Sequence, residues 1–179
     1  MCTTHSVLSS SRLPSASGAA LPVFDLVFTT AERALLKALN DLEVRYLIVG
    51  MGAALIEGAP ATTQVFDLWF GRIDEDRLRE AARRAGGLYT AGFGLQPPAL
   101  GGEGLDRVDL VLTASGLDSF EREFAGAREY ELDGVRVKVL PLERVIVSKR
   151  AAKRPKDSAQ MPILEATLAA RKARIEGQK

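Results

Sequence analysis

The stretch RYLIVGMGAALIEGAPATTQVFDLWFG, from Arg45 to Gly71, decides the fold expected for this chain. Its apolar start, Tyr46 to Val49, is typical of a buried strand and ends at a glycine. A helix of small residues is expected over residues 53–57, and a second strand over residues 64–70 with one acidic residue, Asp67. A glycine turn followed by a strand with an inward carboxylate can hold a phosphate and a metal ion together, because glycine lets the backbone come close.

The flanking sequence predicts further helices and strands. Thr29 to Glu32 has the pattern of a helix-capping box, and an apolar helical face follows as far as Leu42. An amphipathic helix is expected over residues 74–85. The glycine- and proline-rich residues 88–105 predict at most one strand and a mobile loop. Residues 107–113 then predict a strand that contains Asp109.

The C-terminal half continues this alternation. A short helix is expected over residues 117–124, and a hairpin of residues 128–132 and 135–139 around Asp133-Gly134. Pro141 opens a helix through Ala151, and another begins near Pro155, is interrupted at Pro162 and ends with an amphipathic run. The fold class is therefore α+β: a mixed sheet of about five strands flanked by helices, with a C-terminal helical segment.

Length and composition favour one globular domain. The chain has 179 residues, and its 24 Lys and Arg nearly balance its 23 Asp and Glu, so no overall charge attracts it to nucleic acid or a membrane. No apolar run reaches the roughly 20 residues needed to cross a bilayer, and we expect a cytoplasmic protein. We expect residues 1–21 to be a disordered tail, residues 22–140 an α/β core, and residues 141–179 a helical segment packed on the core.

Metal chemistry in this chain would depend on oxygen ligands. Cys2 is the only cysteine and His5 the only histidine, so neither a cysteine zinc site nor a histidine-based triad is expected. Carboxylates favour Mg²⁺ or Mn²⁺. Asp67 and Asp109 lie among apolar neighbours, where a carboxylate is costly to bury unless a cation or donor meets it. Two carboxylates facing one groove could bind a divalent cation. The alternative is that each pairs with an arginine or caps a turn.

A basic run from Ser148 to Asp157 is the second candidate, since five of its ten residues are cationic. On a helix, Lys149, Lys153 and Lys156 would lie roughly on one side. Such a face can bind the phosphates of a triphosphate or of RNA. The alternative is a solvated helix end whose cations interact with the helix dipole.

Together these motifs resemble the nucleotidyltransferase superfamily. This is the polymerase-beta-like group that includes small bacterial proteins related to toxin–antitoxin nucleotidyltransferases. The likeness rests on Gly50, the small-residue helix to Gly58, Thr62-Thr63, Asp67-Leu68-Trp69, and the segment VIVSKRAAKRPKDSAQMPILE. It covers about Thr30 to Leu168, most of the chain.

The resemblance implies a site for Mg²⁺ or Mn²⁺ and a nucleoside triphosphate (NTP). Three family carboxylates from two strands hold two magnesium ions that bridge the NTP and activate the attacking hydroxyl. Asp67 and Asp109 match the second and third, and would be catalytic and metal-binding. The resemblance assigns nucleotide binding to Gly50, Met51, Thr63, Lys149 and Arg154, and a supporting role to Asp157. It also implies an RNA or protein acceptor and a cognate partner protein.

Two positions depart from the family pattern. Val65 stands where the first carboxylate is expected, and Met51, where Gly or Ser is usual, would crowd the phosphates. Losing one charged metal ligand costs on the order of a thousandfold in rate. Glu57 is a conceivable substitute, although it lies at the far end of the predicted helix.

Two main hypotheses follow. The first is a metal-dependent nucleotidyltransferase that moves a nucleoside monophosphate (NMP) to a protein or RNA hydroxyl. The second is a catalytically impaired pseudoenzyme that binds nucleotide, RNA or a partner, for example in a toxin–antitoxin pair. A third hypothesis treats the carboxylates as incidental.

Overall fold

The structure, a computed structural model, describes residues 28–177. The predicted tail and residues 22–27 of the predicted core lie outside the described residues. The elements in chain order are α1 (Thr30–Asp41), β1 (Tyr46–Val49), α2 (Gly50–Ile56), β2 (Phe66–Phe70), α3 (Glu75–Arg84), β3 (Leu88–Thr90), β4 (Ala99–Gly101), β5 (Val108–Val111), α4 (Phe120–Gly126), β6 (Arg128–Leu132), β7 (Val135–Val139), α5 (Leu142–Ala152) and α6 (Pro155–Glu176).

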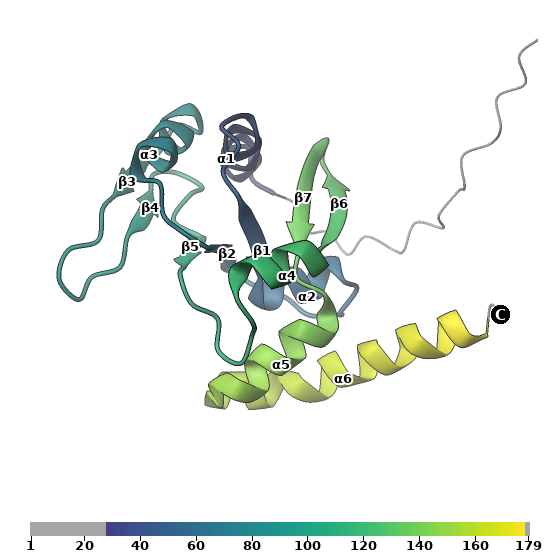
Figure 1. Cartoon of the computed structure of the whole chain (residues 1–179). Helices are drawn as coiled ribbons and strands as arrows, with labels where there is room; N and C mark the ends of the chain where they lie inside the picture. Colours follow the sequence, from purple (N-terminus) through teal and green to yellow (C-terminus); the bar gives the residue numbers. More distant parts are fainter. Residues whose placement is uncertain (1–27, 178–179) are drawn as a thin grey trace, which may run out of the picture.

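Five strands form one mixed sheet in the order β5-β2-β1-β7-β6 (Figure 1). β1 pairs antiparallel with β2 and parallel with β7, while β2 pairs parallel with β5. β6 and β7 form the predicted hairpin, in which Asp133 and Gly134 both have positive φ. The expected α+β fold with a five-stranded mixed sheet is confirmed. This strand order matters for function because it places β2 directly beside β5.

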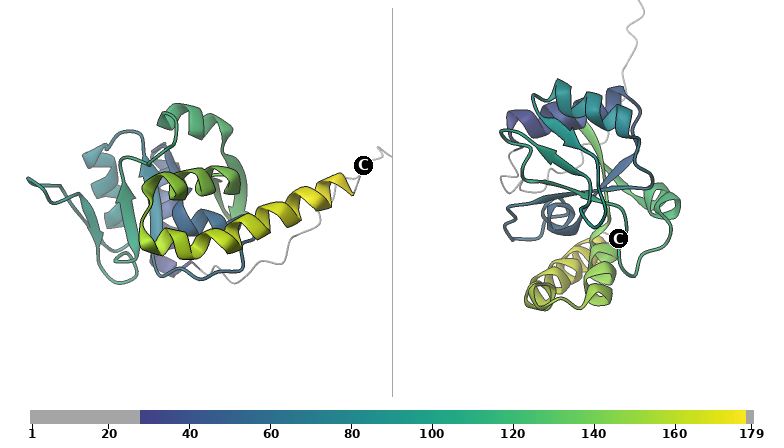
Figure 2. Two further views of the ribbon diagram at one scale, coloured as in Figure 1. Left: turned by 90° about the horizontal axis from the view of Figure 1, so that it is seen from below. Right: turned by 90° about the vertical axis from the view of Figure 1, so that its left-hand side faces the viewer.

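Helices cover the sheet from two sides. α1 and α3 pack next to each other on one side, and α5 and α6 pair on the opposite side (Figure 2). α1 begins with the predicted capping box: the Glu32 backbone N–H donates to the Thr29 hydroxyl at 3.0 Å, and the Thr29 N–H donates to the Glu32 carboxylate at 2.7 Å. Its apolar face supplies Leu35, Leu36 and Leu39 to the core. No helix within residues 28–177 is long and apolar enough to span a bilayer.

Two sequence predictions were wrong. The segment over residues 88–105 contains two strands, β3 and β4, which pair antiparallel as a separate small sheet. Each strand has only three residues, too few for an alternating pattern to stand out. α6 also continues through Pro162, where an interruption was expected. Proline removes one backbone hydrogen bond, and the packing of α6 against α5 retains the helix on both sides of it.

Several element boundaries differ from the prediction by two or three residues. α2 begins at Gly50 instead of Ala53, β2 at Phe66 instead of Gln64, and α4 at Phe120 instead of Leu117. The Ser119 hydroxyl accepts a hydrogen bond from the Arg122 N–H and so determines where α4 begins.

A fully buried carboxylate joins four elements of the fold. Glu57, just after α2, accepts hydrogen bonds from Arg128 and from the Tyr130 hydroxyl (2.5 Å) on β6, from the Leu142 N–H (3.2 Å) at the start of α5, and from Arg171 on α6. Its side chain is 0% exposed. Every oxygen of this carboxylate is thus engaged, and Glu57 does not serve as the substitute metal ligand considered above.

We predict that Glu57→Gln lowers the free energy of unfolding by about 3 kcal/mol or more, because it leaves two arginines without their buried counter-ion. Glu165→Gln is the matched control. Glu165 pairs with Arg150 where both side chains are exposed, and its loss should cost less than about 0.5 kcal/mol. Urea unfolding of both variants checks this prediction. A Glu57→Gln protein as stable as Glu165→Gln would contradict it.

Candidate functional site

The two predicted carboxylates lie side by side on the sheet. β2 and β5 run parallel, and their register pairs Asp67 with Asp109. Residues at the same register position of neighbouring strands point to the same face, so the two side chains share one surface. On its other side Asp67 pairs with Val49, the last residue of β1. The carboxylate pair therefore lies where β1 ends and the chain turns.

That turn depends on Gly50. Its φ is +62°, in the left-handed region that favours glycine, and a Cβ atom there would lie 2.1 Å from Oδ2 of Asp67. The carboxylate thus occupies the space that any other side chain would need. The sequence predicted this glycine for a different reason, the approach of a phosphate.

Asp67 lies near both a like charge and several cations. Burial raises the pKa of the Asp67 carboxyl and the neighbouring charge of Asp109 raises it further, while Lys149, Lys156 and Arg154 act in the opposite direction. The basic run at the junction of α5 and α6 is therefore close enough to influence Asp67. A divalent cation between the two carboxylates would relieve their repulsion.

Lys149 is held in place by the start of α6. Its ammonium group donates to Asp157 and to Gln160, both at 2.8 Å, and the side chain is 8% exposed. The Arg154 guanidinium donates to the second oxygen of Asp157, also at 2.8 Å. Burial would raise the pKa of the Asp157 carboxyl, but these hydrogen bonds outweigh it and hold the pKa below its usual range. Asp157 thus positions Lys149, which retains one of its three donors for another partner.

The remaining predicted residues have different surroundings. Val65 lies just before β2 and is 36% exposed, and the Thr63 hydroxyl donates to the Val65 carbonyl at 2.9 Å. Both line a cavity of about 590 Å³ together with Gln64, Asp106 and Arg107. Sequence reasoning missed Asp106 and Arg107, although they stand three and two residues before Asp109. The Met51 side chain is buried in the core.

The two carboxylates fit a magnesium or manganese ion whose remaining ligands come from water and the phosphates of a bound nucleotide. Within residues 28–177 no three His, Cys, Asp or Glu side chains gather as a metal cage. Mg²⁺ commonly uses one or two carboxylates and completes its shell with water and substrate phosphates. The in-register pair Asp67 and Asp109 would supply two such carboxylates to an ion bound there.

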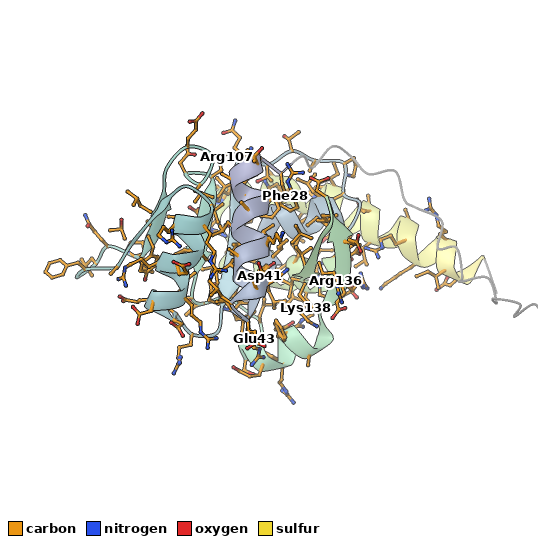
Figure 3. All side chains as sticks on the ribbon, turned by 90° about the horizontal axis from the view of Figure 1, so that it is seen from above. Phe28, Asp41, Glu43, Arg107, Arg136 and Lys138 are labelled. Atoms are coloured by element: carbon orange, nitrogen blue, oxygen red, sulfur yellow. The ribbon has the colours of Figure 1, made fainter. Side chains whose placement is uncertain are left out.

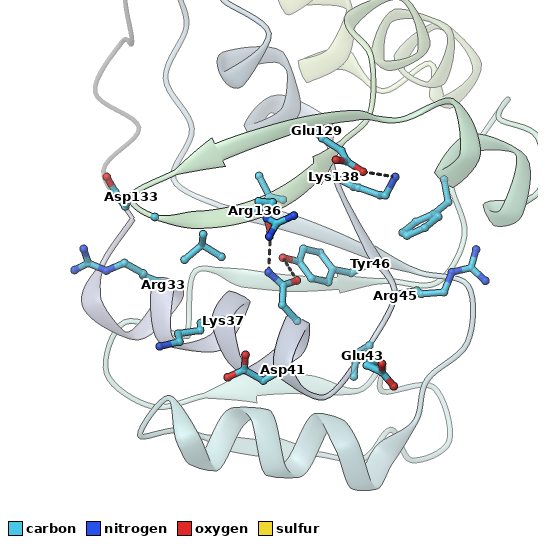
Figure 4. A pocket seen from close by; sticks show the side chains of 16 residues that line it. Arg33, Lys37, Asp41, Glu43, Arg45, Tyr46, Glu129, Asp133, Arg136 and Lys138 are labelled. Atoms are coloured by element: carbon cyan, nitrogen blue, oxygen red, sulfur yellow. Dashed lines mark hydrogen bonds and ion pairs between the residues drawn. The ribbon is translucent and has the colours of Figure 1, made fainter. Parts of the chain in front are cut away.

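A larger cavity, about 830 Å³, lies elsewhere. It is lined by α1, the start of β1 and the hairpin β6–β7 (Figure 4). Figure 3 shows that Arg107, beside the smaller cavity, lies near one end of α1, whereas Asp41 and Glu43, beside the larger one, lie near the other. Cations such as Arg33 and Lys37 alternate with carboxylates around the larger cavity, so its charges favour no one class of ligand.

Comparisons with known proteins support the fold. No protein-family model matches the chain, and a search of curated proteins finds no match. Among solved structures, the crystal structure of ANT(2″)-Ia in complex with adenylyl-2″-tobramycin is similar, with a TM-score of 0.53 and 17% sequence identity over 80% of this chain and 90% of that one. A solution structure of the antibiotic-resistance factor ANT(2″)-Ia aligns with a TM-score of 0.49 and 16% identity, covering 83% and 95% of the two chains. The first of these similarities supports a nucleotidyltransferase-like fold for this chain.

We predict that Gly50→Ala lowers the free energy of unfolding by at least about 1–2 kcal/mol and displaces the Asp67 carboxylate, because alanine disfavours the left-handed conformation and its Cβ would overlap Oδ2. Gly52→Ala, two residues along α2, is the control. A Cβ there would meet Phe66 at an ordinary 3.5 Å, so its stability should stay equal or rise. Thermal unfolding of both variants distinguishes them. Equal melting temperatures would contradict the close contact.

Asp67→Asn should raise stability at neutral pH in the absence of metal. A carboxyl whose folded-state pKa is raised contributes stability below its unfolded pKa and loses that contribution as the pH rises through the folded pKa. The melting temperature of the variant minus that of the wild type should therefore increase from about pH 4 to about pH 8. Melting curves across this range, with chelator present, test the prediction. A variant less stable than the wild type at neutral pH would refute it.

Proposed function

We propose that this protein is a metal-dependent nucleotidyltransferase that moves an NMP from an NTP to an acceptor hydroxyl. The observation that carries the proposal is the in-register pair Asp67 and Asp109 beside Gly50, within the field of Lys149, Arg154 and Lys156. This pair has like charges and no ion-pair partner among the described residues. Such an arrangement is costly for a purely structural site and useful for holding a cation with an anionic ligand.

The reaction assigns a role to each group. Asp67 and Asp109 would hold Mg²⁺ or Mn²⁺, which when bound polarises the phosphoryl oxygens. The acceptor oxygen attacks the α-phosphorus, and a new P–O bond forms. The bond from that phosphorus to the bridging oxygen of the β-phosphate breaks, so pyrophosphate leaves. The acceptor proton passes to solvent. Arg154, Lys156 and the free donor of Lys149 would neutralise the triphosphate. Asp157 keeps Lys149 in position for this role.

Val65 remains the strongest observation in favour of the pseudoenzyme alternative. It lies two residues before Asp67 and cannot bind a cation, so one carboxylate of the family pattern is absent. An ion bound by Asp67, Asp109 and the phosphates would still satisfy the coordination that magnesium prefers. Gly50 and the basic junction of α5 and α6 are also present, and for this reason we favour a slow enzyme over a silent one.

The molecule that receives the NMP is also part of the proposed function. The structure of ANT(2″)-Ia contains adenylyl-2″-tobramycin, in which the adenylyl group is on an aminoglycoside. For this chain we propose a protein or RNA hydroxyl, in the cytoplasm, with a cognate partner protein as in toxin–antitoxin pairs. A small aminoglycoside is an acceptor to be tested beside them.

Transfer of label from each α-labelled NTP, with Mg²⁺ or Mn²⁺, tests the proposal. We expect Asp67→Asn and Asp109→Asn to reduce transfer by about a thousandfold, since each removes a charged metal ligand. Val65→Asp should increase transfer at least about tenfold by restoring the first carboxylate of the family pattern. Glu121→Gln is the matched control: Glu121 is an exposed carboxylate on α4, outside the proposed site, and its loss should leave the rate within about twofold.

Two results would contradict the proposal. One is the absence of any metal-dependent NTP binding by calorimetry in the wild type. The other is transfer that survives Asp67→Asn or Asp109→Asn. Transfer by Val65→Asp alone, with NTP binding by the wild type, would instead establish the pseudoenzyme alternative.

A further inference from the structure

The two-stranded sheet β3–β4 and its connecting loop form an arm, residues 86–102, that projects from the body of the protein (Figures 1 and 2). Its tip is apolar and open to solvent. Phe93 is 87% exposed and Leu95 is fully exposed, and Leu88 on β3 is 73% exposed. A short backbone pairing between Phe93 and Gln96 holds the tip in a defined turn. Clustered exposed apolar side chains of this kind are typical of an interaction surface.

The arm contains no charged residue. Its 17 positions, GGLYTAGFGLQPPALGG, lie in a chain of which 26% is charged. This uncharged composition disfavours charged ligands such as RNA or an aminoglycoside. RNA binds to aromatic side chains accompanied by cations that meet its phosphates, and the arm has none. A polycationic aminoglycoside needs carboxylates, and the arm has none of these either. A neutral apolar patch on a protein is the complementary surface.

The arm is adjacent to the proposed site. β4 packs beside β5, the edge strand that carries Asp109, and the chain between Gly101 and Val108 connects the two strands directly (Figure 1). The base of the arm therefore adjoins the strand that supplies one of the two proposed metal ligands, and a molecule docked on the tip reaches the carboxylate pair only if it is large enough to extend along the arm.

We propose that the acceptor is a protein, and that the arm docks it through Phe93 and Leu95. This inference rests on the proposed function and narrows its acceptor class. The acceptor presents an uncharged apolar patch to the tip and a hydroxyl side chain to the carboxylate pair. That hydroxyl oxygen forms a bond to the α-phosphorus of the NTP, pyrophosphate leaves, and the proton passes to solvent.

The test compares three forms of the full chain: the wild type, the double variant Phe93→Ser with Leu95→Ser, and Ile175→Ser. Ile175 is a matched control because it is a large apolar residue, 60% exposed, at the far end of α6. Each form is incubated with Mn²⁺ and α-labelled NTP and, separately, with three probes: nucleic-acid-free total protein of the source cells, total RNA of the same cells, and tobramycin. Calorimetry measures binding of Mn²⁺ and NTP by each form.

We expect label in protease-sensitive material only. The double variant should transfer at least about tenfold less label to protein than the wild type, because it loses the side chains expected to dominate docking. Ile175→Ser should transfer as much label as the wild type. NTP affinity should be equal in all three. Three results would overturn the inference while NTP binding stays intact. They are label in RNA or on tobramycin, no label in the protein probe, and full transfer by the double variant. Failure of the wild type to bind NTP would instead refute the proposed function.

Discussion

The placement of two carboxylates at one register position of adjacent parallel strands is the constraint on which the site depends. Asp67 on β2 and Asp109 on β5 carry like charges, and Asp67 is also partly buried. The turn after β1 accommodates the Asp67 carboxylate, because Gly50 has no side chain in the space that this carboxylate fills. A cation bound between the two carboxylates would compensate for their repulsion.

Asp67 is partly buried and Asp109 is exposed, whereas the fully buried acids of the described chain contact cations. Glu57 accepts from two arginines, Glu123 pairs with Arg144, and Asp157 pairs with Lys149 and Arg154. These pairs fix structure: Glu57 joins α2 to β6, α5 and α6, and Asp157 joins α5 to α6. Asp67 and Asp109 form no ion pair within residues 28–177, and this contrast supports the proposal that they hold a metal ion.

The sequence predicted the parts of the fold that have local signals. The capping box at Thr29, the turn at Asp133-Gly134 and the apolar run Tyr46 to Val49 each determine structure within a few residues, and each was found. Contacts between distant segments could not be read in this way. The engagement of Glu57 by Arg171, 114 residues away, has no local pattern, and neither does the contact of Gly50 with Asp67. The strands β3 and β4 were missed because each is too short for its periodicity to be detected. The sequence predicted that Asp67 and Asp109 lie on two different strands. It did not predict that the two strands pair in parallel with these residues in register.

The most direct measurement is a crystal structure of the protein with Mn²⁺ and a non-hydrolysable NTP analogue, in which anomalous scattering locates the ion. The site described here predicts a manganese ion about 2–2.3 Å from oxygens of both Asp67 and Asp109, with the triphosphate between it and the start of α6. An ion and nucleotide bound elsewhere, such as in the large cavity between α1 and the β6–β7 hairpin, would contradict it.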